Sequence, residues 1–317
     1  MFCEPNTQNM LTTDQITEIF FLADEYCQFL DQNLEQCIEK LPESTDKRAY
    51  HRPSSMSHSE IITILIAFHQ SDYKTLKHFY CDYVRLFLKK EFPKLVSYNR
   101  FVELQQLCAM HLMMFLMTNC IGQATGISFI DSTKIAVCKN QRIHQHKVFK
   151  DLAQRGKTTT GWFYGFKLHF VINDCGEILS FKLTSGNVAD NNENVLLTLC
   201  KKIFGKLYGD KGYIVKESVF EKLFFDGVHL ITKVKKNMKN KLMSVYDKVM
   251  LRKRALIETI IDQLKNIAQI EHSRHRCFTN FVTNIFAALC AYNFSPKKPS
   301  LKSNFEFHPE NKLQLSL

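Results

Sequence analysis

Two aspartates interrupt segments that are otherwise apolar or rich in glycine. Asp131 follows four apolar or small residues, 127–130, and precedes Ser132-Thr-Lys. Asp210 lies in Tyr208-Gly-Asp-Lys-Gly-Tyr, where the glycines let backbone and ligand approach closely. Because a half-buried carboxylate without a partner is costly, we expect each aspartate to have a partner or a function. For Asp210 the structural alternative is a turn or helix-cap residue.

A third acid, Glu258, lies in the stretch 253–269, whose apolar residues recur with the helical period. Spacings of four and seven residues place Arg254, Glu258 and Lys265 one above another at the edge of the apolar face. Taken alone, this pattern favours an exposed Arg–Glu pair with a lysine nearby. Together with the two aspartates, it favours a catalytic carboxylate.

Three such carboxylates in a basic chain predict a divalent metal site. Mg²⁺ takes oxygen ligands, usually one or two carboxylates together with substrate phosphate. Two such ions about 3.5–4 Å apart can activate a water or a 3′-hydroxyl and stabilise the leaving oxygen. The sequence contains no G-x-x-x-x-G-K-[ST], H-E-x-x-H, G-x-S-x-G or G-x-G-x-x-G pattern, so no other catalytic signature competes.

The elements that must bring these acids together begin near residue 127, where the pattern changes from helical to alternating. Strands are expected at 127–133, 166–172, 179–183, 206–210 and 229–234, and helices at 194–204, 217–225, 253–269 and 280–292. A three-stranded meander followed by alternating helices and strands predicts an α/β fold, with a mixed sheet covered by helices. Ligands of such sheets bind outside the carboxyl ends of the strands, where Asp210 is expected.

Two further residues receive structural interpretations. Asp190 precedes the helix expected at 194–204, so we interpret it as the N-cap of that helix and not as a metal ligand. Trp162, the only tryptophan, begins the second strand and is expected in the core.

The first part of the chain is predicted to be helical. Helical periodicity covers 13–37, 73–88 and 98–117, with Pro93 as a break, and the capping-box pattern Ser57-x-x-Glu60 precedes a further helix. Short helices separated by tight turns could form a helix-turn-helix bundle that binds DNA, or a structural cap.

Composition and charge narrow the class of protein. The chain has 317 residues, 45% hydrophobic with 26 Phe, which is enough for a sizeable core. No apolar run approaches the roughly 20 residues of a membrane span. Acidic residues stand where a signal peptide would have its basic and apolar regions, so we do not expect export. None of the 11 cysteines forms a C-x-x-C pair, so we expect a cytoplasmic protein with reduced thiols. The net charge is −4 over 1–125 and +15 over 126–317, which predicts a polyanionic partner for the second part.

Over roughly 57–294 the chain resembles the DDE transposases of bacterial insertion sequences. The motifs that carry the resemblance are Phe129-Ile-Asp-Ser-Thr133, Gly186-Asn-Val-Ala-Asp190, Tyr208-Gly-Asp-Lys-Gly-Tyr213, Arg254-x-x-x-Glu258-x-x-x-x-x-x-Lys265 and Glu91-Phe-Pro-Lys-Leu-Val-Ser-Tyr-Asn-Arg100. The resemblance implies a ribonuclease H-like domain with a mixed five-stranded sheet. It also implies that Asp131, Asp210 and Glu258 are the DDE triad, which binds two Mg²⁺ ions, with Mn²⁺ as a substitute. In many relatives a tyrosine stands three residues before the arginine, whereas here Leu251 does.

The resemblance also implies domain boundaries and a DNA-binding role for the basic segments. We expect 1–122 to be an all-α domain that binds DNA ends, 123–294 the catalytic domain and 295–317 a mobile tail. Basic segments follow the first strand and lead into the Glu258 helix, and we expect them to contact phosphates without reading sequence. The residues expected to bind DNA are Lys233, Lys235, Lys236, Lys239, Lys241, Arg254 and Lys265.

The predicted function is metal-dependent cleavage at the ends of the element and transfer of the 3′-hydroxyl into target DNA. Its partners would be the terminal inverted repeats and target DNA, with no membrane. Because the two ends of the element must be paired, we expect a homodimer or larger assembly on DNA. We expect the protein to be associated with the bacterial nucleoid. Two alternatives stay open: a ribonuclease H-like nuclease that cuts without joining, and a non-catalytic DNA-binding protein whose affinity is independent of divalent metal.

Overall fold

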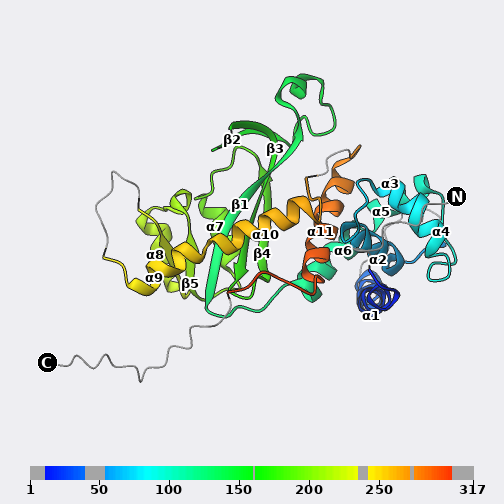
Figure 1. Ribbon diagram of the computed structural model, residues 1–317, viewed down its shortest axis with the longest axis horizontal. Helices are drawn as coiled ribbons and strands as arrows, with labels where there is room; N and C mark the ends of the chain where they lie inside the picture. The colour runs from blue at the N-terminus through cyan, green and yellow to red at the C-terminus, as the bar shows by residue number, and fades with distance from the viewer. Residues whose placement is uncertain (1–10, 40–53, 160, 235–241, 272–274, 302–317) are drawn as a thin grey trace.

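A helical part and an α/β part lie side by side along the long axis of the molecule (Figure 1). The structure is a computed structural model, which describes residues 11–39, 54–159, 161–234, 242–271 and 275–301. Within these residues no single helix is long and apolar enough to cross a membrane, although the bent pair Tyr98–Leu107 and Ala109–Cys120 meets that criterion as a unit.

Six strands form one mixed sheet with β1 (Ile127–Cys138) at its centre. β1 pairs antiparallel with β3 (Gly161–Asn173) and parallel with β5 (Gly205–Gly209). β5 pairs in turn with the parallel edge strand β6 (Val228–Thr232). The free side of β3 is shared by two strands: β2 (Gln154–Thr158) pairs with its first residues and β4 (Ile178–Ser185) with the remainder.

The α/β fold class with a mixed, helix-covered sheet is confirmed, but the expected number of five strands is wrong. The additional strand is β2, whose sequence Gln-Arg-Gly-Lys-Thr has no apolar alternation. Its backbone is held by pairing with β3, and its side chains are mostly exposed. A strand that buries almost no apolar side chain gives no periodic signal to detect.

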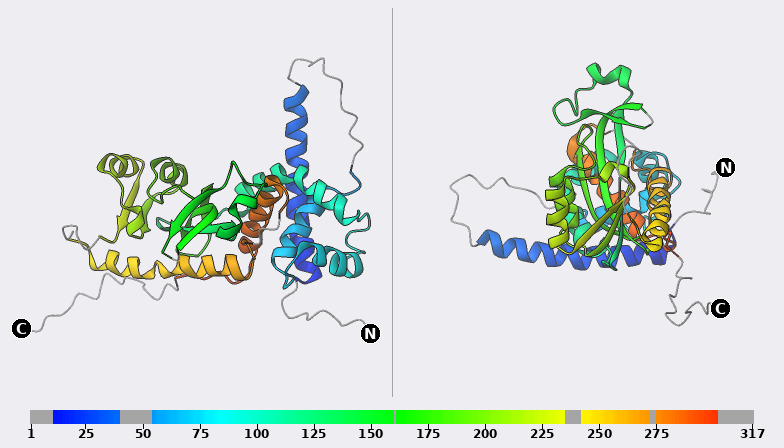
Figure 2. Two further views of the ribbon diagram at one scale, coloured as in Figure 1. Left: turned by 90° about the horizontal axis from the view of Figure 1, so that it is seen from above. Right: turned by 90° about the vertical axis from the view of Figure 1, so that its left-hand side faces the viewer.

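Helices cover both faces of the sheet. On one face, Ile130 and Leu207 share a core with α7 (Glu193–Cys200) and α8 (Glu217–Phe225). On the other face, Phe129 and Tyr208 belong to the core that includes α10 (Ala255–Asn266). The two views of Figure 2 show α7 and α8 on one side of the sheet and α10 on the other. Successive residues of a strand point to opposite faces, so β1 and β5 contribute to both cores.

The helix that carries Glu258 differs in extent from the prediction of 253–269. It begins earlier, as α9 (Val245–Lys253) capped by the Ser244 side chain, and continues as α10 after Arg254. Arg254 keeps right-handed helical angles, so the two helices run on almost as one, yellow to orange in Figure 1.

The helical part consists of α1 (Thr13–Glu39), α2 (His58–His69), α3 (Leu76–His78), the π-helical turn η2 (Phe79–Val84), α4 (Arg85–Phe87), α5 (Tyr98–Leu107), α6 (Ala109–Phe115) and the π-helical turn η3 (Leu116–Cys120). The predicted capping box is present: Ser57 Oγ accepts from Glu60 N, and Glu60 Oε2 accepts from Ser57 N. Nearly every residue of α2 is buried, so this helix is the centre of the helical part.

The last helix, α11 (Phe278–Asn293), returns to the helical part and packs against α2, α5 and α6. Its side chains share one continuous core with those helices and with the α10 face of the sheet. The predicted domain boundaries at 122 and 294 stay predictions. The packing shows that α11 joins the two parts of the molecule.

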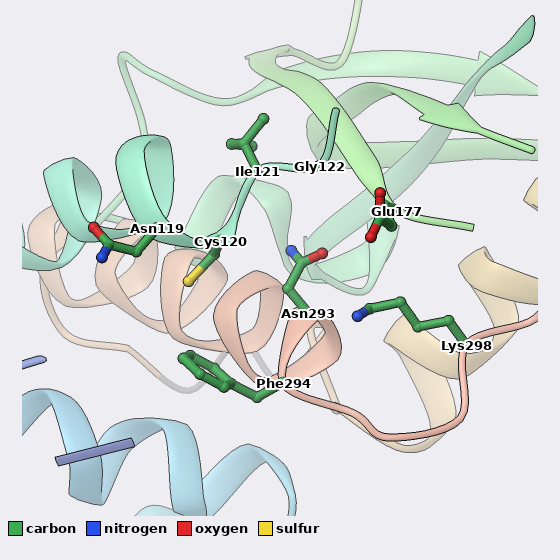
Figure 3. A pocket seen from close by; sticks show the side chains of 8 residues that line it. All are labelled: Asn119, Cys120, Ile121, Gly122, Glu177, Asn293, Phe294 and Lys298. Atoms are coloured by element: carbon green, nitrogen blue, oxygen red, sulfur yellow. The ribbon is translucent and has the colours of Figure 1, made fainter. Parts of the chain in front are cut away.

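A small cavity of about 160 Å³ marks the junction of the two parts (Figure 3). Its lining comes from residues 119–122, from Glu177 and from Asn293, Phe294 and Lys298. It is smaller than the roughly 300–1,000 Å³ of most ligand sites. Of the predicted mobile tail, the structure describes 295–301, where Leu301 N donates to Asp174 O in the β3–β4 turn.

The remaining short elements are the 3-10 turns η4 (Asn140–Gln145), after β1, and η5 (Lys211–Tyr213), after β5. The nine cysteines that the structure describes are all free thiols.

Candidate active site

The register of two parallel strands places Asp131 and Asp210 side by side. Phe129 on β1 is paired with Tyr208 on β5, and each aspartate lies two residues beyond that pair. Neighbouring strands are about 4.8 Å apart, and residues two apart point to the same face. Both aspartates therefore lie at the carboxyl ends of their parallel pairing, on the face that α10 covers.

Asp131 is the most deeply enclosed of the predicted acids. Its side chain is 19% exposed, Ser132 N donates to Oδ1 at 2.8 Å, and Arg254 Nη1 donates to Oδ2 at 2.7 Å. Burial raises the pKa of Asp131 to about 6, against the lowering effect of Arg254 and the Ser132 amide, and Asp210 raises it further. The single guanidinium of Arg254 therefore does not fully offset the effect of burial on the Asp131 carboxylate.

Glu258 reaches the same place through Arg254. The Arg254 guanidinium is 15% exposed, and its Nη2 donates to Glu258 Oε1 at 2.5 Å while its Nη1 contacts Asp131. The Glu258 side chain is 58% exposed, so it stands at the open side of the site. The structure thus brings together Asp131, Asp210 and Glu258, which are far apart in sequence. Arg254 was predicted to contact DNA and here bridges two of the acids.

Asp210 also has the local role that the alternative interpretation gave it. Its Oδ1 accepts from Gly212 N at 2.7 Å and caps η5. A Cβ on Gly212 would lie 2.9 Å from Asp210 Oδ1 and 3.5 Å from Asp190 Oδ2. A side chain at residue 212 would therefore require the Asp210 carboxylate to shift, whereas its contact with Asp190 would be an ordinary van der Waals contact.

Asp190 is the functional candidate that sequence reasoning missed, and its interpretation as a helix cap is wrong. The N-cap of α7 is Asn192, whose side chain accepts from Val195 N. Asp190 Oδ1 instead accepts from Ser132 Oγ at 2.7 Å and from Lys167 Nζ at 3.1 Å. It is therefore a fourth acid near the predicted triad, close to the turn that Asp210 caps.

The surroundings of Asp190 are buried and polar. Lys167 is 9% exposed at its side chain and also donates to Val188 O. Burial lowers the pKa of His169 to about 4, so this imidazole is neutral at pH 7 although Asp190 lies 3.9 Å away. Burial, then Asp131 and Asp190, raise the pKa of Tyr213, which stays a neutral phenol among the acids. The sequence held one indication of this polar cluster: strand alternation puts Lys167 and His169 on the same face of β3.

A basic groove of about 650 Å³ adjoins Asp190. Its lining includes Arg155, Lys157, Lys167 and Lys211, together with Trp162. The expectation that Trp162 is a core residue is wrong: the side chain is 61% exposed, and Lys157 Nζ lies 5.6 Å from the ring centroid. Positive charges and an exposed indole beside the acids suit a polyanion that carries aromatic bases.

The other predicted DNA contacts are distributed differently. Lys233 follows β6, and Lys235, Lys236, Lys239 and Lys241 lie outside the described residues. Lys265 lies about 10 Å along α10 from Glu258. Its Nζ pairs with Glu271 Oε1 at 2.6 Å, so in this structure it does not join the acids.

The donor set suits a hard divalent cation. Asp131, Asp210 and Glu258 offer carboxylate oxygens only, which are the ligands that Mg²⁺ and Mn²⁺ prefer. Burial, and then the neighbouring Asp210, raise the pKa of Asp131, and a bound divalent ion would favour the carboxylate form against both effects.

Sheet order, register and the acids define the class to which this protein belongs. A ribonuclease H-like sheet with carboxylates on two adjacent parallel strands and on a following helix is the framework of metal-dependent enzymes that act on phosphodiester bonds. Residues 121–278 match the family model of the transposase DDE domain, and the chain belongs to the DDE-type transposases. DNA is the substrate of this family, and its domains use divalent metal ions. No curated protein matches the chain.

Proposed function

We propose that this chain is the transposase of a bacterial insertion sequence, which cuts DNA at the ends of the element and joins the freed 3′-hydroxyl to target DNA. The observation that carries the proposal is the Arg254 bridge between Asp131 and Glu258, with Asp210 in register beside Asp131. One acid on β1, one that follows β5 and one on α10 lie near the carboxyl end of the β1–β5 pairing, and we propose that substrate binds there.

In this proposal Asp131, Asp210 and Glu258 hold two Mg²⁺ ions, and Mn²⁺ can substitute for them. When bound, such ions supply Lewis acidity that makes a water or 3′-hydroxyl a better nucleophile and stabilises the leaving oxygen. The chain's own residues position the carboxylates. Arg254 fixes Asp131 and Glu258, and the Ser132 amide fixes the second oxygen of Asp131.

The basic residues would hold the phosphate backbone. The groove beside Asp190 provides positive charge next to the acids, and Lys233 follows β6. Lys235, Lys236, Lys239 and Lys241 lie outside the described residues, and we propose further phosphate contacts for them. Arg254 and Lys265 have N–H donors suited to phosphate oxygens near the scissile bond. These contacts would position DNA and leave sequence discrimination to other elements.

Recognition of the terminal inverted repeats is assigned to the helical domain 1–122. The catalytic domain is 123–294, the tail 295–317, and the site of action the bacterial cytoplasm at the nucleoid. Because two ends must be paired, we propose a homodimer or larger assembly on DNA.

The test is a joining assay with duplexes that carry the inverted repeats flanking the gene and a circular target plasmid. With Mg²⁺ we expect 3′-nicked ends and labelled ends joined to the plasmid. A matched control on the same helix is Asp262→Asn, which removes a carboxylate one turn from Glu258 and should leave both products. Cleavage without joining would favour the ribonuclease H-like nuclease, and binding without cleavage in Mg²⁺ or Mn²⁺ would favour a non-catalytic DNA-binding protein.

A further inference from the structure

Three potential metal ligands meet between helices of the N-terminal part, away from the acidic site. Asp31 lies on α1, His58 is the first residue of α2 and His111 lies on α6. His111 Nε2 is 2.8 Å from Asp31 Oδ1, and the centroids of the His58 and His111 rings are 3.9 Å apart. One ligand atom from each residue lies within 4.8 Å of the other two.

The hydrogen bonds of this cluster leave a buried nitrogen unsatisfied. His111 is 6% exposed, and its Nδ1 is buried with no hydrogen-bond partner among the described residues. Buried polar atoms normally have a partner, and each exception calls for an explanation. The Asp31 side chain is 49% exposed, so the cluster is open to solvent on one side.

Two thiols lie next to the three residues. Cys27 is one helical turn before Asp31, and Cys108 is three residues before His111 and donates to His58 O. Burial raises the pKa of Cys27 to about 12, so this thiol is neutral. The two imidazoles of the cluster, in contrast, suit a borderline-soft cation better than Mg²⁺.

We propose that Asp31, His58 and His111 bind one Zn²⁺ ion that fastens α1 to α2 and α6. Two imidazole nitrogens and one carboxylate oxygen are a common zinc ligand set, at about 2.0–2.2 Å from the ion. Water would complete the tetrahedron on the exposed Asp31 side. Both views of Figure 2 show α1 extending beyond the other helices, so a link at Asp31 would fix the orientation of this projecting helix.

The experiment must separate this site from the acidic one. We would therefore use the full chain in an Asp131→Asn, Asp210→Asn, Glu258→Gln background and titrate it with Zn²⁺ in competition with a chromophoric chelator. We expect one Zn²⁺ per chain in that background, and Co²⁺ in its place should give the visible absorption of a tetrahedral site. Adding Asp31→Asn should weaken Zn²⁺ binding by more than about 10–100-fold, which is the loss expected when only an outer-shell partner of a metal ligand is removed.

The control for charge on the same helix is Asp14→Asn, which should leave Zn²⁺ affinity unchanged. Because Asp31 is half exposed, its amide variant should fold. A chelator should lower the Tm of the background chain and leave that of the Asp31→Asn chain unchanged. Absence of bound Zn²⁺ in the background chain, or equal affinity with and without Asp31→Asn, would overturn the proposal.

Discussion

The Asp131 carboxylate combines burial, an arginine partner and a neighbouring acid, and these act on its charge in opposite directions. Burial dominates, so its pKa is about 6 instead of the 3.8 of a free aspartate. The folded chain therefore binds a proton at Asp131 more readily than the unfolded chain does between these values. This contribution to stability is present below pH 3.8 and is lost as the pH rises through about 6.

The same titration predicts the pH dependence of metal binding. A protonated Asp131 is a poor ligand, so Mn²⁺ affinity at the acidic site should fall by up to about tenfold per pH unit below pH 6. Calorimetric titration of the Asp31→Asn chain at pH 5, 6 and 7 would measure this with metal binding at the histidine cluster weakened. Equal affinity at pH 5 and pH 7 would show that Asp131 is not a ligand.

The Lys167–Asp190 pair gives a second prediction at this scale. Lys167→Met leaves a partly buried carboxylate without its cation, which should lower the free energy of unfolding by about 1–3 kcal/mol. Urea denaturation is the measurement. Adding Asp190→Asn should recover much of the loss, because the amide carries no charge. Full additivity of the two changes would mean that the residues are not coupled.

At the scale of residues, the sequence drew attention to the three acids that the structure brings together, and less to the residues around them. Asp131 interrupts an apolar strand, Asp210 stands in a glycine-rich turn, and Glu258 lies at the edge of a strongly apolar helix face, so each is conspicuous in sequence. Asp190 is not, because both Asp190 and Asn192 are good helix caps and local pattern cannot choose between them. Its true partner Lys167 is 23 residues away, on another strand.

At the scale of elements, the α9–α10 pair positions site residues, and α2 forms the core of the helical part. α9 and α10 deliver Arg254 and Glu258 to the ends of β1 and β5, whereas α2 is the buried centre of the helical part. Apolar periodicity predicted these helices, and alternation predicted β3 and β4. The apolar pattern did not predict β2, because this strand is held by backbone pairing and buries almost no apolar side chain.

The capping box of α2 can be tested directly. Ser57→Ala removes the acceptor for Glu60 N and should destabilise the chain by about 1 kcal/mol. Thermal or urea unfolding would measure the change. The neighbouring exposed Ser55→Ala is the control and should have little effect. A Ser57→Ala chain as stable as the wild type would show that α2 is held by packing alone.

At the scale of the whole molecule, the positive charge lies with the sheet and its groove. Neither the return of α11 to the N-terminal helices nor the shared core could be predicted, because contacts between distant segments leave no local pattern. The charge division was visible in sequence, since counting residues needs no structure. It places the expected polyanion on the α/β part.

Replacing Arg155, Lys157 and Lys211 together with Gln tests the groove. If each neutralises one phosphate, the slope of log affinity against log salt should fall by about 2–3. Binding to end and random duplexes should weaken alike, since phosphate contacts carry no base information. Lys201→Gln with Lys202→Gln, at the exposed end of α7, is the control. An unchanged slope, or a loss confined to end DNA, would contradict this role.

The central claim is that Asp131, Asp210 and Glu258 form one divalent metal site that cleaves DNA. Its most direct test compares Glu258→Gln with Asp262→Asn on the same helix, by measuring end binding and end cleavage in Mg²⁺, Mn²⁺ and Ca²⁺. We expect Glu258→Gln to bind ends within a few fold of the wild type and to lose cleavage, while Asp262→Asn retains both. Mg²⁺ and Mn²⁺ should support cleavage. Ca²⁺ should support DNA binding but only slow cleavage. Cleavage at the wild-type rate by Glu258→Gln, or without divalent metal, would contradict the claim.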